Sequence, residues 1–104
     1  MRKCRCWAGS LPADDFERWC VQPAKRLIAR LRVQHSGAKV IGFPRGAGDK
    51  IPRYVAETGV DAVSLGNELD RAYIRDEIQT RVPVQGNVDP KILLEGGAAL
   101  DREV

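Results

Sequence analysis

The sequence lacks the features that mark membrane and secreted proteins. It has no run of about 18 apolar residues, so no transmembrane helix is predicted. Residues 1–6 are basic, but no apolar run follows them, which argues against a secretory signal. We therefore expect a protein of the cytoplasm.

Cysteine and histidine are also scarce, with three cysteines and one histidine in 104 residues. Cys4 and Cys6 stand one residue apart without a second pair of ligands, so no metal site is expected. Cys20 falls on the apolar face of a predicted helix and is expected to be a buried thiol. His35 ends a predicted helix, where it can interact with the terminal carbonyl groups. A structural role is expected for both.

Aromatic residues make up only 6% of the chain, and its basic residues are scattered. No nucleic-acid motif is present, so nucleic acid is not an expected partner. The net charge of +3 and the isoelectric point near 9.0 are compatible with a polyanionic ligand. They fit a slightly basic soluble protein equally well.

What the chain does contain is a repeated pattern of helix, apolar run and glycine turn. The apolar runs span residues 40–43, 62–65 and 82–85. Their alternation with helical segments predicts βα units in a parallel sheet. The recurrence of roughly twenty residues per unit is typical of a (β/α)8 barrel, whose complete form needs around 250 residues. A degraded fourth strand is predicted at residues 3–7.

The predicted fold is therefore α/β, with parallel βα units forming a partial (β/α)8 TIM-barrel fragment of about three to four of the eight units. Residues 1–104 form a single partial domain, read as a fragment or a truncated product. The helix over 23–33 is expected to start afresh at Pro23, to bury Leu27, Ile28 and Leu31, and to turn its basic side chains to water.

A helix is predicted at residues 14–20, with Phe16, Trp19 and Cys20 on one side. Further helices are predicted at residues 49–57, with Gly59 as the C-terminal cap, and at residues 69–79, with Asn67 as the N-cap. The last two are predicted at residues 90–95 and 98–104.

The turn after the third run carries the most information. Gly86 and Asn87 tolerate a tight turn, Asp89 suits an N-cap and Pro90 suits the first helical position. A strand-to-helix turn of this kind points the Gln85 side chain and backbone N–H groups into a crevice. In parallel α/β folds, ligands bind in that crevice.

This segment resembles the QGNxDP segment of uroporphyrinogen decarboxylases. Residues 43–48 are similar to the glycine-rich loop of that family, and Trp7-Ala8-Gly9 with Leu11-Pro12 resembles its tryptophan–alanine–glycine turn. Residues 58–63 resemble its helix-to-strand turn. The four segments occur in the family's order, so the chain is identified as a member of the family, covering part of its C-terminal half.

The resemblance implies decarboxylation of the four acetate side chains of uroporphyrinogen to give coproporphyrinogen, a step of haem biosynthesis, with no metal or organic cofactor. The family's central aspartate and arginine cluster have no counterpart in this sequence. No catalytic residue is therefore identified, and the isolated chain is expected to be inactive. A porphyrinogen is the expected partner once the missing half is supplied.

Four loops are predicted at the C-terminal ends of the strands, where barrels of this kind bind ligands. The candidate substrate-binding residues on them are Cys6, Phe43, Arg45, Gly46, Gln85 and Asn87. Arg45 is the best candidate for a carboxylate contact, with an ion pair at the barrel rim as the alternative. Gln85 is expected either to bind the ligand or to satisfy loop backbone groups. Where the family has serine, aspartate and a second aspartate, this chain has Cys6, Arg5 and Gly66.

Two alternatives remain open. An open half-sheet exposes its edges, which favours self-association or pairing with a complementary half by a non-catalytic remnant. The superfamily also contains zinc-dependent methyltransferases with a similar barrel, whose metal is held by histidine and cysteines. Cys4, Cys6 and His35 do not fall where such a site needs them.

Overall fold

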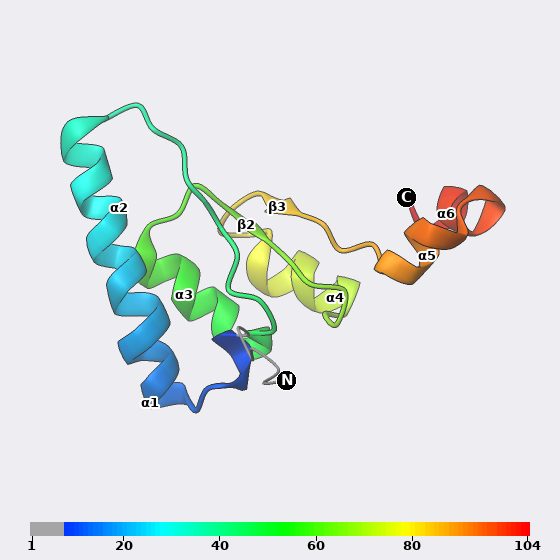
Figure 1. Cartoon of the computed structure of the whole chain (residues 1–104), viewed down its shortest axis with the longest axis horizontal. Helices are drawn as coiled ribbons and strands as arrows, with labels where there is room; N and C mark the ends of the chain where they lie inside the picture. Colours follow the sequence, from blue (N-terminus) through cyan, green and yellow to red (C-terminus); the bar gives the residue numbers. More distant parts are fainter. Residues whose placement is uncertain (1–7) are drawn as a thin grey trace, which may run out of the picture.

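The computed structural model describes residues 8–104 and contains a three-stranded parallel sheet. Its strands β1 (Ile41–Gly42), β2 (Ala62–Ser64) and β3 (Val84–Gln85) lie side by side in chain order. Helices α2, α3 and α4 lie next to one another on one side of the strands (Figure 1). The prediction of a partial βα barrel is confirmed. The fourth strand predicted at residues 3–7 lies outside the described residues.

The first helical stretch continues through Pro23. It consists of α1 (Ala13–Phe16), the π-helical turn η2 (Glu17–Val21) and α2 (Gln22–Gln34). The predicted break at Pro23 is therefore wrong. In the wide turn the Gln22 N–H bonds to the Glu17 carbonyl, five residues back. A π-turn at this position gives the proline ring room that a regular turn lacks.

The next helix begins with the 3-10 turn η3 (Gly48–Lys50) and continues as α3 (Ile51–Thr58). Gly59 ends it in the left-handed region, with φ of 70°, as predicted for a C-terminal cap. The following helix consists of α4 (Arg71–Tyr73) and the π-helical turn η4 (Ile74–Ile78). Its N-cap is Asp70, whose side chain accepts from the Tyr73 N–H at 3.2 Å. The prediction that this helix starts at residue 69 with Asn67 as its cap was wrong, because Asn67 lies in the preceding turn.

The last two helices are α5 (Pro90–Glu95) and α6 (Gly97–Glu103), which together form a small lobe away from the sheet (Figure 1). The predicted cap at Asp89 is confirmed, since its Oδ1 accepts from the Lys91 N–H at 2.9 Å. An Arg71–Glu103 ion pair joins the lobe to α4. Neither helix of the lobe buries a residue.

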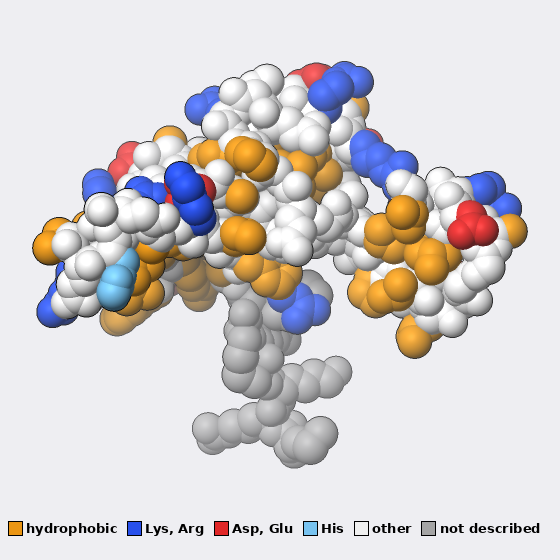
Figure 2. All heavy atoms as spheres, turned by 90° about the horizontal axis from the view of Figure 1, so that it is seen from above, with side chains coloured by type: hydrophobic (Ala, Val, Ile, Leu, Met, Phe, Trp, Pro, Cys, Tyr) orange, Lys and Arg blue, Asp and Glu red, His pale blue; other side chains and the backbone are white. Residues whose placement is uncertain are grey.

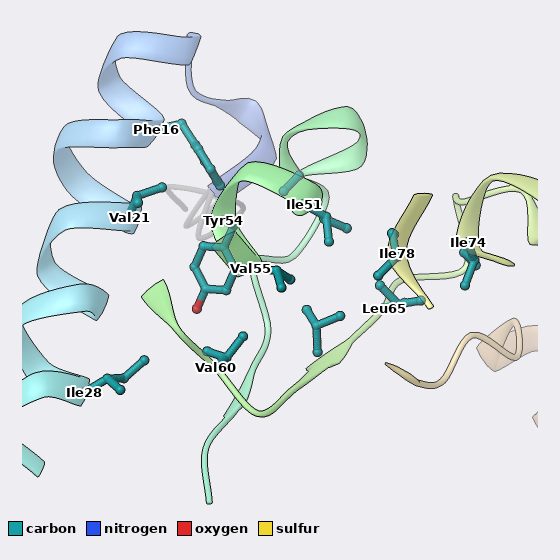
Figure 3. Close-up of a cluster of buried hydrophobic side chains, with 12 residues drawn as sticks. Phe16, Val21, Ile28, Ile51, Tyr54, Val55, Val60, Leu65, Ile74 and Ile78 are labelled. Carbon is teal, nitrogen blue, oxygen red and sulfur yellow. The ribbon is translucent and has the colours of Figure 1, made fainter. Parts of the chain in front are cut away.

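The core lies between the sheet and the helices (Figure 3). Val63 at the centre of the sheet is fully buried, as are Val21 from η2, Ile51 from α3 and Ile78 from η4. The expectation that Leu27 is buried was wrong, because its side chain is 70% exposed. Trp19, on the preceding turn, is 62% exposed. The rest of the core consists of Phe16, Ile28, Ala47, Tyr54, Val55, Val60, Leu65 and Ile74.

Cys20 and Arg32 also differ from expectation. The Cys20 thiol is half-buried and packs against the core, and this burial raises its pKa, with Lys50 acting in the opposite direction. The Arg32 guanidinium does not simply face water, because it donates to Asp61 Oδ2 at 2.9 Å. The same oxygen accepts from the Val40 N–H at 2.8 Å. Asp61 therefore ties α2 to the start of two strands.

None of the helices within residues 8–104 has both the length and the apolar composition that crossing a bilayer requires.

Candidate functional site

The sheet has one face covered by helices and one face that is open among the described residues. Gly42 and Val63 are paired in register and buried against the helices, whereas Ile41 is 59% exposed and Phe43 is 54% exposed. Ser64 is paired with Gln85 in the same register. Because side chains alternate along a strand, Phe43, Ser64 and Gln85 form a row across the open face. In a barrel this face is the interior.

The turn η1 (Ala8–Ser10) is seated directly on the glycine-rich loop at residues 43–48. The Gly9 N–H donates to the Arg45 carbonyl oxygen at 3.0 Å. A Cβ added to Gly9 would lie 1.5 Å from the Gly46 carbonyl oxygen, so no other residue fits this position as it stands. Two of the predicted loops are thus held against each other, backbone to backbone.

The Lys50 side chain also holds the segment around η1 in place. Its Nζ donates to the Leu11 carbonyl at 3.0 Å and to the Gly9 carbonyl at 3.4 Å. The ammonium group also lies 5.5 Å from the centre of the Phe16 ring. Sequence reasoning missed Lys50. The available signal was a cation just before a helix, where the dipole disfavours positive charge unless another partner is present.

The loops after β2 and β3 are joined in a similar way. The Leu65 N–H donates to the Gln85 carbonyl at 2.8 Å. Gly86 has φ of 101°, and a Cβ there would lie 2.7 Å from the Leu65 carbonyl oxygen. The Asn87 side chain donates through Nδ2 to the Leu69 carbonyl at 3.1 Å. Asn87 therefore holds the two loops together.

The predicted site residues divide into three groups. Phe43, Arg45 and Gln85 have exposed side chains at the strand ends, where a ligand could reach them. Gly46 is half-buried and Asn87 is used in loop-to-loop contacts. Cys6 lies outside the described residues. Ser64, which sequence reasoning had assigned only to a strand, joins Phe43 and Gln85 in their row.

No group of three or more His, Cys, Asp or Glu side chains between residues 8 and 104 is arranged to hold a metal ion. Cys20 lies beside the core in η2, whereas His35 is exposed at the far end of α2. At about 1.5 Å per residue, helix length alone keeps the two side chains well apart.

Comparison with known proteins assigns this arrangement to a family. The family model described as Uroporphyrinogen decarboxylase (URO-D) matches residues 4–104. The chain belongs to the uroporphyrinogen decarboxylase family. A protein named uroporphyrinogen decarboxylase from Rhizorhabdus wittichii is 49% identical over 98 residues, which cover 94% of this chain and 28% of that protein.

Two further relatives with the same name agree. The protein from Sphingopyxis alaskensis is 45% identical, with 94% of this chain and 29% of the relative covered. The protein from Maricaulis maris is 46% identical, with 94% and 28% covered. The chain thus spans less than a third of the length of the curated relatives it matches.

Proposed function

We propose that this chain supplies part of the substrate-binding wall of a uroporphyrinogen decarboxylase in the cytoplasm. The reaction would convert the acetate side chains of uroporphyrinogen to methyl groups and so give coproporphyrinogen. The observation that carries the proposal is the row of Phe43, Ser64 and Gln85 on the open sheet face. In a family whose fold is a barrel, that row lines the interior at the end where ligands bind.

The residues of this wall suit a flat macrocycle that carries carboxylates. The exposed Phe43 ring offers an apolar surface for a pyrrole, and the Gln85 amide can donate to or accept from the substrate. Arg45 offers a planar set of donors that fits a carboxylate in a bidentate manner. Gly46 lies in the same loop as Arg45 and offers its backbone to a ligand, and Cys6, outside the described residues, is proposed as a further substrate contact.

The chemistry itself needs no metal or organic cofactor. A proton added to the pyrrole ring makes the ring an electron sink, and the C–C bond to the carboxylate breaks as carbon dioxide leaves. Its electron pair passes into the ring. A second proton then converts the exocyclic methylene to a methyl group, and the ring releases the first proton. Fixed charges placed where charge develops would provide the acceleration.

No residue among those described is assigned to these proton transfers, so the isolated chain should show no turnover. The decisive experiment is a chimera in which residues 4–104 replace the matching segment of the Rhizorhabdus wittichii protein. Coproporphyrinogen formation from uroporphyrinogen is then followed by chromatography. We expect the chimera to be active and Arg45→Ala within it to raise KM about tenfold or more, which is the loss of one charge-assisted contact.

A folded chimera without activity would contradict the proposal. So would an Arg45→Ala chimera with unchanged KM, as far as the role of Arg45 is concerned. Lys91→Ala is the matched control, because this cation lies on α5 away from the row of Phe43, Ser64 and Gln85.

A further inference from the structure

The Glu68 side chain folds back over the end of β2. A Cβ added to Gly66 would lie 2.7 Å from Glu68 Cδ and 2.8 Å from its Oε1, and closer still to its Oε2. The carboxylate therefore fills the space that a side chain at residue 66 would need. Gly66 is not among the glycines with positive φ, so its backbone conformation does not itself require glycine. The position has to stay small because the Glu68 carboxylate occupies it.

This carboxylate lies on the open face of the sheet. Leu65 is buried against the helices and its N–H donates to the Gln85 carbonyl, so the chain stays extended beyond Ser64. Because side chains alternate along a strand, position 66 projects to the same face as Ser64. Glu68 therefore holds its carboxylate one step beyond the row that contains Ser64, toward the end of the strands where barrels bind ligands.

The charge of Glu68 is not neutralised by the described part of the chain. Within residues 8–104 its carboxylate has no ion-pair or hydrogen-bond partner, and the residue is exposed. Such a carboxylate repels another anion that comes within a few ångströms of it. Arg45, the proposed contact for a substrate carboxylate, lies on the loop after the neighbouring strand β1. Adjacent loops at the same end of the sheet thus carry charges of opposite sign.

We propose that Glu68 is a specificity-determining residue of the substrate-binding wall. Its carboxylate keeps a carboxylated side chain of the macrocycle away from the end of β2 and admits an uncharged methyl group there. Discrimination of this kind combines a favourable contact with the right group and an unfavourable contact with the wrong one. Arg45 supplies the first and Glu68 supplies the second. The inference rests on the proposed function, from which it takes the macrocycle.

The two charges orient the macrocycle as its acetate side chains are removed. Each decarboxylation leaves a methyl group where an acetate stood, so a pyrrole that has already reacted has lost a charge that Glu68 repels. That pyrrole can lie at the end of β2, whereas a pyrrole that still carries its acetate is directed toward Arg45. Glu68 therefore shifts the preference of the site from uroporphyrinogen toward partly decarboxylated porphyrinogens.

The test measures the binding of two porphyrins to the chimera in which residues 4–104 replace the matching segment of the Rhizorhabdus wittichii protein. The probes are uroporphyrin and coproporphyrin, the oxidised and fluorescent forms of the substrate and the product. Coproporphyrin has a methyl group in place of each acetate of uroporphyrin. Fluorescence titration gives the dissociation constant of each. The full 104-residue chain is titrated in the same way, so the comparison does not depend on how the chimera folds.

Glu68→Gln removes the charge and keeps the size of the side chain. Two unit charges about 4 Å apart in water change a binding constant by about fivefold. Uroporphyrin should therefore bind about fivefold more tightly to the variant, whereas the dissociation constant of coproporphyrin should change less than twofold. The difference should shrink at high salt, which screens exposed charges.

Two further variants make the test specific. Gly66→Asp combined with Glu68→Ala attaches an acid to the strand itself, in the space that the Glu68 side chain vacates. It should bring the ratio of the two dissociation constants back to within twofold of its original value. Glu95→Gln is the matched control, because Glu95 lies on α5 in the lobe at the right of Figure 2. It should leave both dissociation constants unchanged.

The inference would be overturned if Glu68→Gln left uroporphyrin binding unchanged, if it tightened both porphyrins equally, or if Glu95→Gln had the same effect. A folded chimera that binds neither porphyrin would overturn it as well. Turnover is measured separately. A chimera that shows the Glu68-dependent preference but forms no coproporphyrinogen contradicts the proposed function and leaves this inference standing. An active chimera in which Glu68→Gln has no effect contradicts this inference alone.

Discussion

Asp61 Oδ2 receives the Arg32 guanidinium at 2.9 Å and the Val40 backbone N–H at 2.8 Å. One carboxylate oxygen thus connects α2, the start of β1 and the start of β2. The Val40 N–H and, after it, the Arg32 guanidinium hold the pKa of Asp61 below its usual value. Arg32 lies near the end of α2 and Asp61 lies just before β2, so this bond joins the helical layer to the sheet.

The first prediction concerns pH. The pKa of Asp61 is lower in the folded chain than in the unfolded chain, where it is near 3.8. The unfolded state therefore binds this proton more readily, and stability falls as the pH drops below about 4. Asp61→Asn should lower the urea midpoint at pH 7 and reduce the difference between pH 7 and pH 3. Circular dichroism at a series of pH values measures both.

Asp76→Asn is the matched control for this experiment. Asp76 also has a lowered pKa, because Arg75 donates to it. That pair is exposed and joins adjacent residues of one helix, so it fixes no tertiary contact. Equal losses from Asp61→Asn and Asp76→Asn would contradict the role given to Asp61.

The second prediction concerns the contact between the first two loops. A methyl group on Gly9 would overlap the Gly46 carbonyl oxygen, because the two atoms would be only 1.5 Å apart. Backbone must therefore move, at a cost of about 1–3 kcal/mol or more in the free energy of unfolding. Gly37→Ala is the control, since a Cβ there meets nothing within 4 Å. Urea titration of both variants should show a loss for Gly9→Ala alone.

The third prediction concerns Lys50. Lys50→Met keeps most of the apolar stem beside Phe16 but removes the donor to the Gly9 and Leu11 carbonyls. A hydrogen bond from a charged group contributes about 1.5–3 kcal/mol, so losing the 3.0 Å bond to Leu11 should cost about 2 kcal/mol, and the longer 3.4 Å bond to Gly9 should add less. Lys91→Met should be nearly neutral, and amide hydrogen exchange should speed up at residues 9–11 only in the Lys50 variant. Slow exchange there in Lys50→Met would show that the turn does not depend on this cation.

The fourth prediction separates two candidate caps of the same helix. Asp70 accepts from the Tyr73 N–H, whereas Asn67 lies three residues earlier in a turn. Asp70→Ala should therefore cost about 1 kcal/mol, the usual effect of losing an N-cap. Asn67→Ala should cost clearly less. The reverse order in thermal or urea unfolding would favour Asn67 as the cap.

The sequence predicts the sheet well because each strand is a short apolar run between a helix and a glycine turn. The pairs Gly42–Val63 and Val63–Val84 fall within the predicted runs, and Asp89 and Gly59 cap their helices as expected. Each of these features depends on residues close to it in the chain, so the sequence alone is sufficient to predict it.

The predictions that were wrong depend on packing or on backbone geometry that residue type alone does not determine. The 3.6-residue pattern places Leu27 on the apolar side of its helix. It does not show whether another element covers that side, and in the described residues Leu27 is 70% exposed. Pro23 predicts a break only if the preceding turn is regular, and here that turn is π-helical. Asn67 and Asp70 are equally good cap residues, and only the geometry of the loop distinguishes them.

The candidate site was partly predictable for the same reason. Phe43 and Gln85 follow directly from their places at strand ends, whereas Ser64 joins them only through the register of β2 and β3. Lys50 could not be placed, since its partners lie about 40 residues earlier in the chain.

Gly9 lies so close to the Gly46 carbonyl that there is no space for a side chain between these two segments, which are far apart in the chain. An insertion or deletion in either segment would misalign the other, so natural variants should change length in both segments together or in neither. The same constraint means that a redesigned rim has to treat residues 8–10 and 43–48 as one transplantable unit.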